Sequence, residues 1–191
     1  MRRIFTAIDI SDEARRRTSD YIENLRGEFS DLRVGWERAE KLHLTLKFLG
    51  DIEEEQLEDL VEAVRKTAEQ FSNFKLQISE TGAFPSQKNA RILWLGALAK
   101  QGSLQRLNET LETECERKGL EKEKRNFKPH LTIARLREPM KSKELVEQHL
   151  RNDFASIEVT VSKIVIYESR LEKSGSVYSV VSKHELTGMT G

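Results

Sequence analysis

The sequence predicts an α+β fold built from antiparallel sheets with flanking helices. Segments with strand and helix periodicity are mixed along the 191 residues without a strict βαβ rhythm, and the hairpins are short, which favours antiparallel pairing. Units of strand, helix and strand recur around two matching stretches, one at residues 43–46 and one at residues 130–133. This recurrence predicts two pseudo-symmetric lobes, which the fold must bring together because the stretches are far apart in the chain.

The first half of the chain is expected to contain three strands and two helices. Residues 4–10 read as a buried strand, and Ser11 is a plausible N-cap for a helix over residues 12–29. A short strand at 34–37 precedes the first matching stretch. Residues 53–71 form a strongly amphipathic helix, because their apolar positions fall on one stripe: Leu57, Leu60, Val61, Val64 and Ala68.

The second half is expected to repeat this plan around the second matching stretch. Alternating or apolar runs predict strands, and helical spacing predicts helices. The expected strands are 74–79, 91–96, 157–167 and 177–181, and the expected helices are 104–119 and 144–149. We therefore expect a single two-lobed domain over residues 1–186 and a loose tail over residues 187–191.

Composition predicts a soluble, cytoplasmic monomer. Charged residues make up 34% of the chain and balance at 32 of each sign, so no net field attracts nucleic acid or membranes. The single cysteine, Cys115, fits a reducing compartment and is expected in the core because of its helical spacing from Leu111. No apolar run reaches the length of a membrane span, so we expect no membrane association.

The two matching stretches each present a histidine and a threonine on one face of a strand. Successive side chains of a strand point to opposite faces. His43 and Thr45 therefore lie opposite the apolar residues between and after them, and His130 and Thr132 do the same. If the two faces meet, they form a site with two titratable rings and two hydroxyl groups.

This constellation suits the hydrolysis of a phosphodiester. One neutral histidine can take a proton from water while a protonated one gives a proton to the leaving oxygen. The threonine hydroxyls can donate to the phosphate oxygens, where negative charge develops. No metal or other cofactor is required, and none is expected, because no carboxylate shares the histidine faces at ligand spacing.

The flanks of these motifs resemble those of one family over nearly the whole chain. The matching segments are residues 5–9, 42–50, 82–85, 91–96, 129–135 and 167–171. They resemble the two-histidine phosphoesterases, and among them the RNA 2′,3′-cyclic phosphodiesterases, once called 2′-5′ RNA ligases. The resemblance implies a bilobal fold with an active cleft between the lobes. It also implies that RNA or nucleotide 2′,3′-cyclic phosphates are opened to 2′-phosphates.

The resemblance further implies a role for each motif residue. His43 would be the proton donor, His130 the proton acceptor, and Thr45 and Thr132 would bind the phosphate. The family pattern also places Arg135 near the phosphate, where a guanidinium suits a dianionic product. Strict alternation puts Arg135 on the face opposite His130, so it can join the site only if the strand ends or bulges at Ala134.

Several further residues have both a functional and a structural interpretation. Alternation puts Lys47 on the His43 face, although it could simply reach solvent. Four aromatic residues could stack a terminal base or belong to the core: Phe48, Phe84, Phe127 and Tyr167. Four cations before the second motif could steer RNA or form a solvated loop: Lys122, Lys124, Arg125 and Lys128. The sequence also indicates that Trp36 and Trp94 are core residues and that His149 and His184 are structural or exposed.

Two other functions remain open from the sequence. One is a phosphodiesterase or ligase acting on 2′-5′ linked oligonucleotides, which would use the same residues on a different ester. The other is a non-catalytic module that binds RNA or nucleotides and uses its histidines only as hydrogen-bonding groups.

Overall fold

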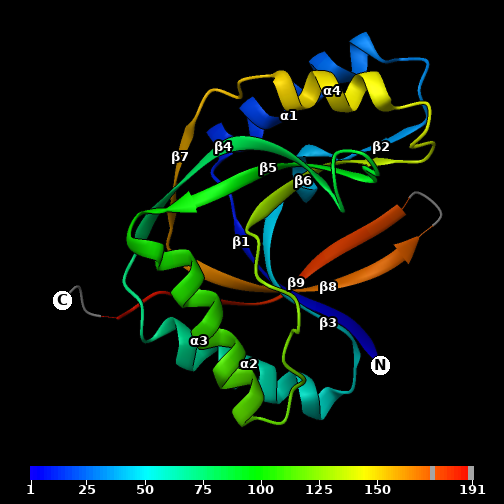
Figure 1. The fold of residues 1–191 in the computed structure, drawn as a ribbon. Coiled ribbons are helices and arrows are strands. Elements are labelled where there is room, and N and C mark those ends of the chain that lie inside the picture. Colours follow the sequence, from blue (N-terminus) through cyan, green and yellow to red (C-terminus); the bar gives the residue numbers. More distant parts are fainter. Residues whose placement is uncertain (173–174, 189–191) are drawn as a thin grey trace.

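The structure is a computed structural model that describes residues 1–172 and 175–188. Figure 1 shows helices on two opposite sides of a curved arrangement of strands. The helices are α1 (Asp12–Glu28), α2 (Glu54–Ala68), α3 (Ser103–Arg117) and α4 (Lys143–Arg151), with two short 3-10 helices, η1 (Ala39–Lys41) and η2 (Lys100–Gly102). The strands are β1 (Arg2–Asp9), β2 (Val34–Trp36), β3 (His43–Ile52), β4 (Phe74–Phe84), β5 (Ile92–Ala99), β6 (His130–Leu136), β7 (Ile157–Val161), β8 (Lys163–Glu172) and β9 (Gly175–Glu185).

The described strands form a single antiparallel sheet with a narrow junction at its centre. The order is β7-β4-β5-β6-β3-β1-β8-β9, and β2 pairs with β6. β5 occupies one edge of β6, so β3 and β2 share the other edge, where β3 pairs through Leu44 and Leu131. We call β3, β1, β8 and β9 the β3 half, and β6, β5, β4, β7 and β2 the β6 half. The predicted α+β fold with two related lobes is confirmed.

Each half of the sheet is covered by two helices. α2 and α3 pack together, α2 contacts β8 and β9, and α3 contacts both β3 and β5, whereas α1 contacts β7 and α4 contacts β4. α1 follows β1 of the β3 half yet covers the β6 half, and α3 follows β5 of the β6 half yet packs on α2 and also reaches β3. These two helices join the two lobes into one core.

Local signals explain where two of the helices begin. The Ser11 hydroxyl oxygen accepts a hydrogen bond from the backbone N–H of Ala14 at 3.2 Å, as expected for an N-cap. At the start of α2, Glu53 and Gln56 form a reciprocal capping box. Both devices satisfy backbone donors that would otherwise lack partners at a helix start.

Residues 157–167, expected to form one strand, belong to two strands in different halves of the sheet. β7 pairs with β4 in the β6 half, and β8 pairs with β1 in the β3 half. Ser162 alone separates them. The alternation of buried and exposed residues in β7 ends at Val161, and β8 buries Ile164, Val165 and Ile166 in succession. The prediction of one strand was wrong because it treated the apolar residues on both sides of Ser162 as a single alternating run.

The strand expected at residues 74–79 extends to Phe84. β4 pairs with β5 along most of its length, with a register shift between Ile78 and Glu80. Gly82, which lies beyond the expected end of the strand, is within the ladder opposite Trp94. A Cβ atom at Gly82 would meet the Trp94 ring at 2.0 Å. Glycine is therefore required at this position for close packing rather than for a turn.

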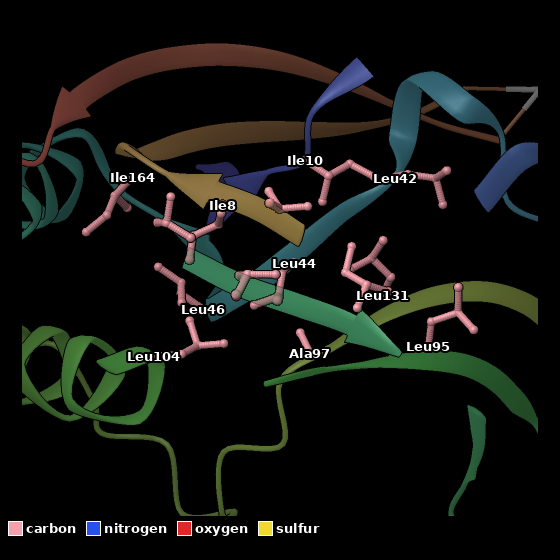
Figure 2. Close-up of a cluster of buried hydrophobic side chains, with 14 of the residues drawn as sticks. Ile8, Ile10, Leu42, Leu44, Leu46, Leu95, Ala97, Leu104, Leu131 and Ile164 are labelled. Atoms are coloured by element: carbon pink, nitrogen blue, oxygen red, sulfur yellow. The ribbon is translucent and has the colours of Figure 1, made fainter. Parts of the chain in front are cut away.

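The hydrophobic core fills the space between the two halves of the sheet and their helices. Figure 2 shows Leu46 next to Leu104 of α3, with Leu44 between Leu46 and Leu131. Leu44 and Leu131 have no exposed surface, and neither has Cys115, in agreement with its predicted core position. The apolar residues of both matching stretches thus anchor the junction of the two halves.

Within the described residues, no helix is long and apolar enough to cross a membrane. The loose tail expected over residues 187–191 falls partly outside the described chain, because residues 189–191 are not described. The backbone N–H of Thr187 donates to the Ala68 carbonyl at 3.2 Å, and that of Gly188 donates to the Phe71 carbonyl at 2.9 Å. These two residues are therefore attached to the C-terminal end of α2.

Candidate active site

The two His-x-Thr stretches begin the two strands that meet at the centre of the sheet. His43 is the first residue of β3 and His130 the first residue of β6. Leu44 pairs with Leu131 and both point into the core. The histidines and threonines therefore project from the other face, as the alternation predicts.

A β-bulge comes after the threonine in each strand. Between β1 and β3 the register passes from Ala7 opposite Thr45 to Thr6 opposite Lys47, so one residue of β3 is unpaired. Between β5 and β6 it passes from Trp94 opposite Thr132 to Leu93 opposite Ala134. The extra residues are Leu46 and Ile133. A bulge reverses the parity of the residues on its C-terminal side.

The bulges bring Phe48 and Arg135 to the histidine face and turn Lys47 away from it. Phe48 and Arg135 both line the cavity that the histidines line. Lys47 is 4% exposed, and its ammonium group donates to a Glu112 carboxylate oxygen at 2.6 Å and to the Glu121 carbonyl at 2.7 Å. The expectation from strict alternation that Lys47 shares the His43 face, or reaches solvent, is therefore wrong.

The histidine faces meet in a cavity of about 120 Å³ that draws residues from both halves of the sheet. Both histidines and both threonines line it, together with a mixture of charged, hydroxyl and aromatic groups. The remaining lining residues are Phe5, Glu37, Lys41, Phe48, Arg135, Ser169 and Tyr178. The structure thus brings together five of the predicted site residues that bear hydroxyl, imidazole or guanidinium groups.

Each histidine ring is held by a hydrogen bond to the carbonyl two residues before it. The His43 Nδ1–H donates to the Lys41 carbonyl at 2.6 Å, and the His130 Nδ1–H donates to the Lys128 carbonyl at 2.7 Å. These bonds assign the Nδ1–H tautomer to the neutral rings, which leaves Nε2 as the basic atom. The Thr45 hydroxyl lies 3.1 Å from Nε2 of His43 and can donate to it.

The segment before His43 is itself anchored. The Arg15 guanidinium on α1 donates to the Leu42 carbonyl at 3.2 Å and to the Ala39 carbonyl. An arginine from the first helix therefore holds the junction of η1 and β3, from which the His43 side chain projects.

Aromatic rings pack around both imidazoles. His43 lies 4.9 Å from Phe5 and 5.5 Å from Tyr178 between ring centroids. His130 lies 4.9 Å from Phe84, edge to face. These contacts restrict the orientation of the rings and reduce their access to water, so each Nε2 atom occupies a defined position.

Burial lowers the pKa of both histidines, because desolvation penalises the charged form. The bond to the Lys41 carbonyl and the negative charge of Asp9 act in the opposite direction on the pKa of His43. For His130, the bond to the Lys128 carbonyl raises the pKa while the positive charge of Arg135 lowers it further. The two rings thus lie in different electrostatic surroundings, with Asp9 and Arg15 near His43 and Arg135 near His130.

The structure separates the four predicted aromatic candidates. Phe48 lines the cavity and is 50% exposed. Phe84 packs against His130. Tyr167 donates its hydroxyl hydrogen to Asp9 at 2.6 Å and stacks on Phe5 at 5.3 Å between ring centroids. Phe127 packs against the core and is placed as a structural residue.

The basic patch expected before the second motif is largely neutralised by neighbouring carboxylates. Lys122 pairs with Glu116 at 3.7 Å, Lys124 with Glu121 at 3.4 Å and Arg125 with Glu123 at 2.9 Å. Lys128 differs, because its ammonium group lies over the ring of Phe84, which packs against His130. These pairs leave little net positive charge in this segment.

Trp94, expected in the core, lies on the histidine side of β5. Its ring centroid is 6.2 Å from that of His130 and 5.1 Å from that of Phe84. Its neighbours Leu93 and Leu95 point into the core instead. The tryptophan therefore supports the aromatic wall behind His130, and the prediction of a core position was wrong. Trp36 is partly buried and packs against the core, as predicted.

His149 and His184 are structural, as the sequence indicated. His149 is fully buried, its Nε2–H donating to the carbonyls of Gly82 and Trp94 while Nδ1 accepts from the Tyr21 hydroxyl at 2.9 Å. His184 is half-buried and hydrogen bonds with the Ser182 hydroxyl at 2.9 Å. Neither lines the cavity at the two motifs.

The sequence did not single out several residues of the cavity. Phe5 and Tyr178 lie on strands, where alternation could have placed them on the histidine face. Glu37 directly follows β2, Lys41 ends η1 and Ser169 lies on β8. Glu37 and Lys41 reach the cavity because of the path of the chain between β2 and β3, which no periodic signal predicts.

Among residues 1–172 and 175–188, no group of three or more histidine, cysteine, aspartate or glutamate side chains is arranged to hold a metal ion. The groups that do converge on the cavity are acid–base groups, hydroxyl donors and cations. This set can exchange protons and bind an anion.

Comparison with known proteins gives a consistent result. A family model described as the 2′-5′ RNA ligase superfamily matches residues 11–172. The RNA 2′,3′-cyclic phosphodiesterase of Thermotoga maritima is 33% identical over 189 residues, which cover 97% of this chain and 96% of the relative. The RNA 2′,3′-cyclic phosphodiesterase of Methanothermobacter thermautotrophicus is 31% identical over 180 residues, which cover 93% of this chain and 95% of the relative.

Solved structures show the same fold. A protein of Thermus thermophilus superposes with a TM-score of 0.80 at 26% identity, covering 98% of this chain and 100% of that protein. LigT of E. coli, solved as a complex with 3′-AMP, superposes with a TM-score of 0.74 at 24% identity, covering 97% of this chain and 98% of that protein.

Proposed function

The chain belongs to the 2′-5′ RNA ligase superfamily, and from this membership we propose that it opens RNA or nucleotide 2′,3′-cyclic phosphate ends to 2′-phosphates. The proposed reaction is a metal-independent hydrolysis by general acid–base catalysis between two histidines. The names of the similar proteins support the substrate class, since several curated relatives are RNA 2′,3′-cyclic phosphodiesterases.

The observation that carries the mechanism is the convergence of His43 and His130 on one small cavity. Each ring has its Nδ1–H tied to a carbonyl, so each neutral ring offers Nε2 as the atom that takes or gives a proton. Two such atoms facing one cavity suit a reaction that removes a proton at one side of phosphorus and delivers one at the other.

In the proposed reaction, a water oxygen attacks phosphorus and its proton passes to Nε2 of His130. The bond between phosphorus and the ribose 3′ oxygen breaks, and Nε2–H of His43 protonates that oxygen. The product carries a 2′-phosphate and a 3′-hydroxyl. Proton transfer from His130 back to His43 through solvent restores the starting state.

The electrostatic surroundings support this assignment of acid and base. Among the charges around His43, Asp9, which raises the pKa of the ring, has a larger effect than Arg15, which lowers it. The positive charge of Arg135 lowers the pKa of His130 and so favours a neutral ring that can accept one. A bound phosphate anion would raise the pKa of either ring, which offsets the effect of burial when substrate is present.

Thr45, Thr132 and Arg135 are proposed to bind the phosphate. When His43 is protonated, its Nε2–H can donate to the Thr45 oxygen, which leaves the hydroxyl hydrogen free for a phosphate oxygen. Thr132 occupies the matching place in the other motif. The Arg135 guanidinium would stabilise charge that develops on the non-bridging oxygens. Phe48 is the exposed cavity residue best placed to contact a base.

The test is incubation of the protein with a nucleoside 2′,3′-cyclic phosphate in the presence of EDTA, followed by phosphorus NMR of the product. The proposal expects a 2′-phosphomonoester formed without added metal. A 3′-phosphate product, or activity that EDTA abolishes, would contradict the proposed regiochemistry or the proposed metal independence.

Hydrolysis or synthesis of 2′-5′ linked oligonucleotides remains a second candidate, because the family model is described by that ligation. A ribose 5′-hydroxyl in the place of water would run the same proton transfers to a 2′-5′ bond. The protein is proposed to act as a monomer, since one chain supplies both histidines, both threonines and Arg135.

A further inference from the structure

Glu37 places a carboxylate in the cavity that both histidines line. The residue comes directly after β2, at the point where β2 and β3 exchange along one edge of β6. Its backbone N–H donates to the carbonyl of Ile133, the bulged residue of β6, at 2.9 Å. The carboxylate is therefore held beside Thr132 and Arg135 by the main chain and not by a flexible loop.

Charged and hydroxyl groups from three elements line the cavity together with Glu37. Lys41 belongs to η1, Arg135 to β6 and Tyr178 to β9 of the other half. Burial raises the pKa of Glu37 and the negative charge of Glu40 raises it further, whereas a hydrogen bond with the Arg38 backbone and the positive charges of Lys41 and Arg135 lower it. Burial also raises the pKa of Tyr178, and the charge of Glu37 acts in the same direction while that of Arg135 acts against it.

A carboxylate is an unexpected neighbour for a phosphate, and the charge of the phosphate changes during the proposed reaction. A cyclic phosphodiester carries one negative charge. The phosphomonoester formed by ring opening carries close to two above its second pKa of about 6. Repulsion from a fixed carboxylate therefore acts about twice as strongly on the product as on the substrate.

We infer that Glu37 is a specificity-determining residue that disfavours dianionic phosphomonoesters relative to monoanionic phosphodiesters. This inference rests on the proposed function and extends it to the release of product. Arg135 and Lys41 attract both anions, and Glu37 sets how much better the dianion binds. Without it, two cations would favour the product over the substrate, and the enzyme would be inhibited by its own product.

The size of the effect can be derived from the electrostatics of a partly buried cavity. One additional unit charge at a separation of several ångströms changes an affinity by roughly ten-fold at intermediate effective dielectric. Removal of the Glu37 charge should strengthen binding of both ligands, and it should strengthen that of the dianion by roughly ten-fold more.

The experiment compares two inhibitors that differ by one charge, adenosine 2′-monophosphate and its phosphate O-methyl ester. Their inhibition constants are measured against turnover of adenosine 2′,3′-cyclic phosphate at about pH 8, where the monoester is a dianion. The variants are Glu37→Gln, which removes the charge and keeps the shape, and Glu37→Asp, which keeps the charge. Glu58→Gln is the matched control, because Glu58 is an exposed carboxylate of α2, outside the cavity lining.

The expected result is that the ratio of the two inhibition constants shifts by about ten-fold toward the dianion in Glu37→Gln and stays near the wild-type ratio in Glu37→Asp and Glu58→Gln. Glu37→Ala provides a second charge-removing variant if Glu37→Gln does not fold. An unchanged ratio in a folded charge-removing variant would overturn the inference. Absence of wild-type turnover would contradict the proposed function itself, and this is seen before any inhibitor is added.

Discussion

Leu44 of β3 and Leu131 of β6 face each other where the two halves of the sheet meet. In an antiparallel pair with this register, His43 lies across from Thr132 and Thr45 lies across from His130. Each histidine therefore has a threonine of its own strand and one of the other strand beside it. The pair of Leu44 and Leu131 lies on the core face of this junction, and the cavity lies on the opposite face.

Truncation of this pair should destabilise the protein. Leu131→Ala removes a side chain with no exposed surface and leaves a cavity between the halves. We expect the free energy of unfolding to fall by about 2–5 kcal/mol, measured by urea denaturation. Leu171→Ala is the control, since Leu171 is 87% exposed and its loss should change stability by less than about 0.5 kcal/mol. Equal effects of the two changes would contradict the role given to the junction.

The buried ion pair of Lys47 and Glu112 joins β3 to α3 and to the segment that leads to His130. Glu112 also accepts from the backbone N–H of Glu123 at 3.1 Å. Lys47→Met leaves an unpaired carboxylate in the interior, and we expect a loss of about 3–5 kcal/mol in the free energy of unfolding. The exposed pair of Lys66 and Glu62 offers a matched control, where Lys66→Met should cost less than about 1 kcal/mol. If Lys47→Met lowered the free energy of unfolding by no more than Lys66→Met, the pair of Lys47 and Glu112 would not stabilise the segment that leads to His130.

The pH dependence of kcat/KM should report the two histidines of the unliganded protein. Burial lowers both pKa values below the usual 6.5, so the optimum of kcat/KM should lie below about pH 6.5, with activity falling as His43 loses its proton. Asp9→Asn removes a charge that raises the pKa of His43, so the alkaline limb should move to lower pH. The exposed Asp12 provides the control Asp12→Asn, which should leave both limbs in place. A shift of the acid limb in Asp9→Asn would contradict this assignment and indicate that His43 is the base and His130 the acid.

Arg135 should affect both the binding of phosphate and the acid limb of the same profile. Arg135→Gln removes a cation that lowers the pKa of His130, so the acid limb should move to higher pH. We expect kcat/KM to fall by about ten- to a hundred-fold, because a charge-assisted contact to the phosphate is lost. Arg137→Gln removes an exposed cation two residues further along, outside the cavity lining, and should have little effect. Unchanged kinetics in Arg135→Gln would place the guanidinium outside the phosphate site.

The paired motifs could be predicted from the sequence because both obey strand alternation closely. His43 and Thr45, and likewise His130 and Thr132, sit opposite leucine or isoleucine residues that fill the core. Burial of apolar residues on one face is the strongest signal in a strand. It predicted the face of the motif residues and the α+β class of the fold.

The bulges could not be predicted, because an inserted residue leaves no mark in the pattern when it is apolar. Leu46 and Ile133 continue the apolar face, yet each shifts the register and reverses the parity of the later residues in its strand. This is why strict alternation put Lys47 on the wrong face and left the position of Arg135 open. The crossing at Ser162 differs, because the strict alternation of β7 ends there and β8 buries three successive residues, Ile164, Val165 and Ile166.

Trp94 and the cations of residues 122–125 show two further structural features that the sequence pattern did not predict. A tryptophan between leucines reads as core, whereas the ring packs behind His130 on the other face of β5. Lys122, Lys124 and Arg125 read as a patch, whereas each has a carboxylate partner within a few residues. Side-chain pairing in a loop depends on its path, which periodicity does not predict.

The most direct test of the two-histidine mechanism is the turnover of an RNA oligomer with a 2′,3′-cyclic phosphate end by His43→Ala and His130→Ala, in EDTA. His184→Ala is the control, since His184 lies outside the cavity lining. We predict a loss of about a hundred-fold or more in each motif variant, with melting temperatures close to that of the wild type and full activity in the control. Wild-type turnover in either His43→Ala or His130→Ala would contradict the mechanism.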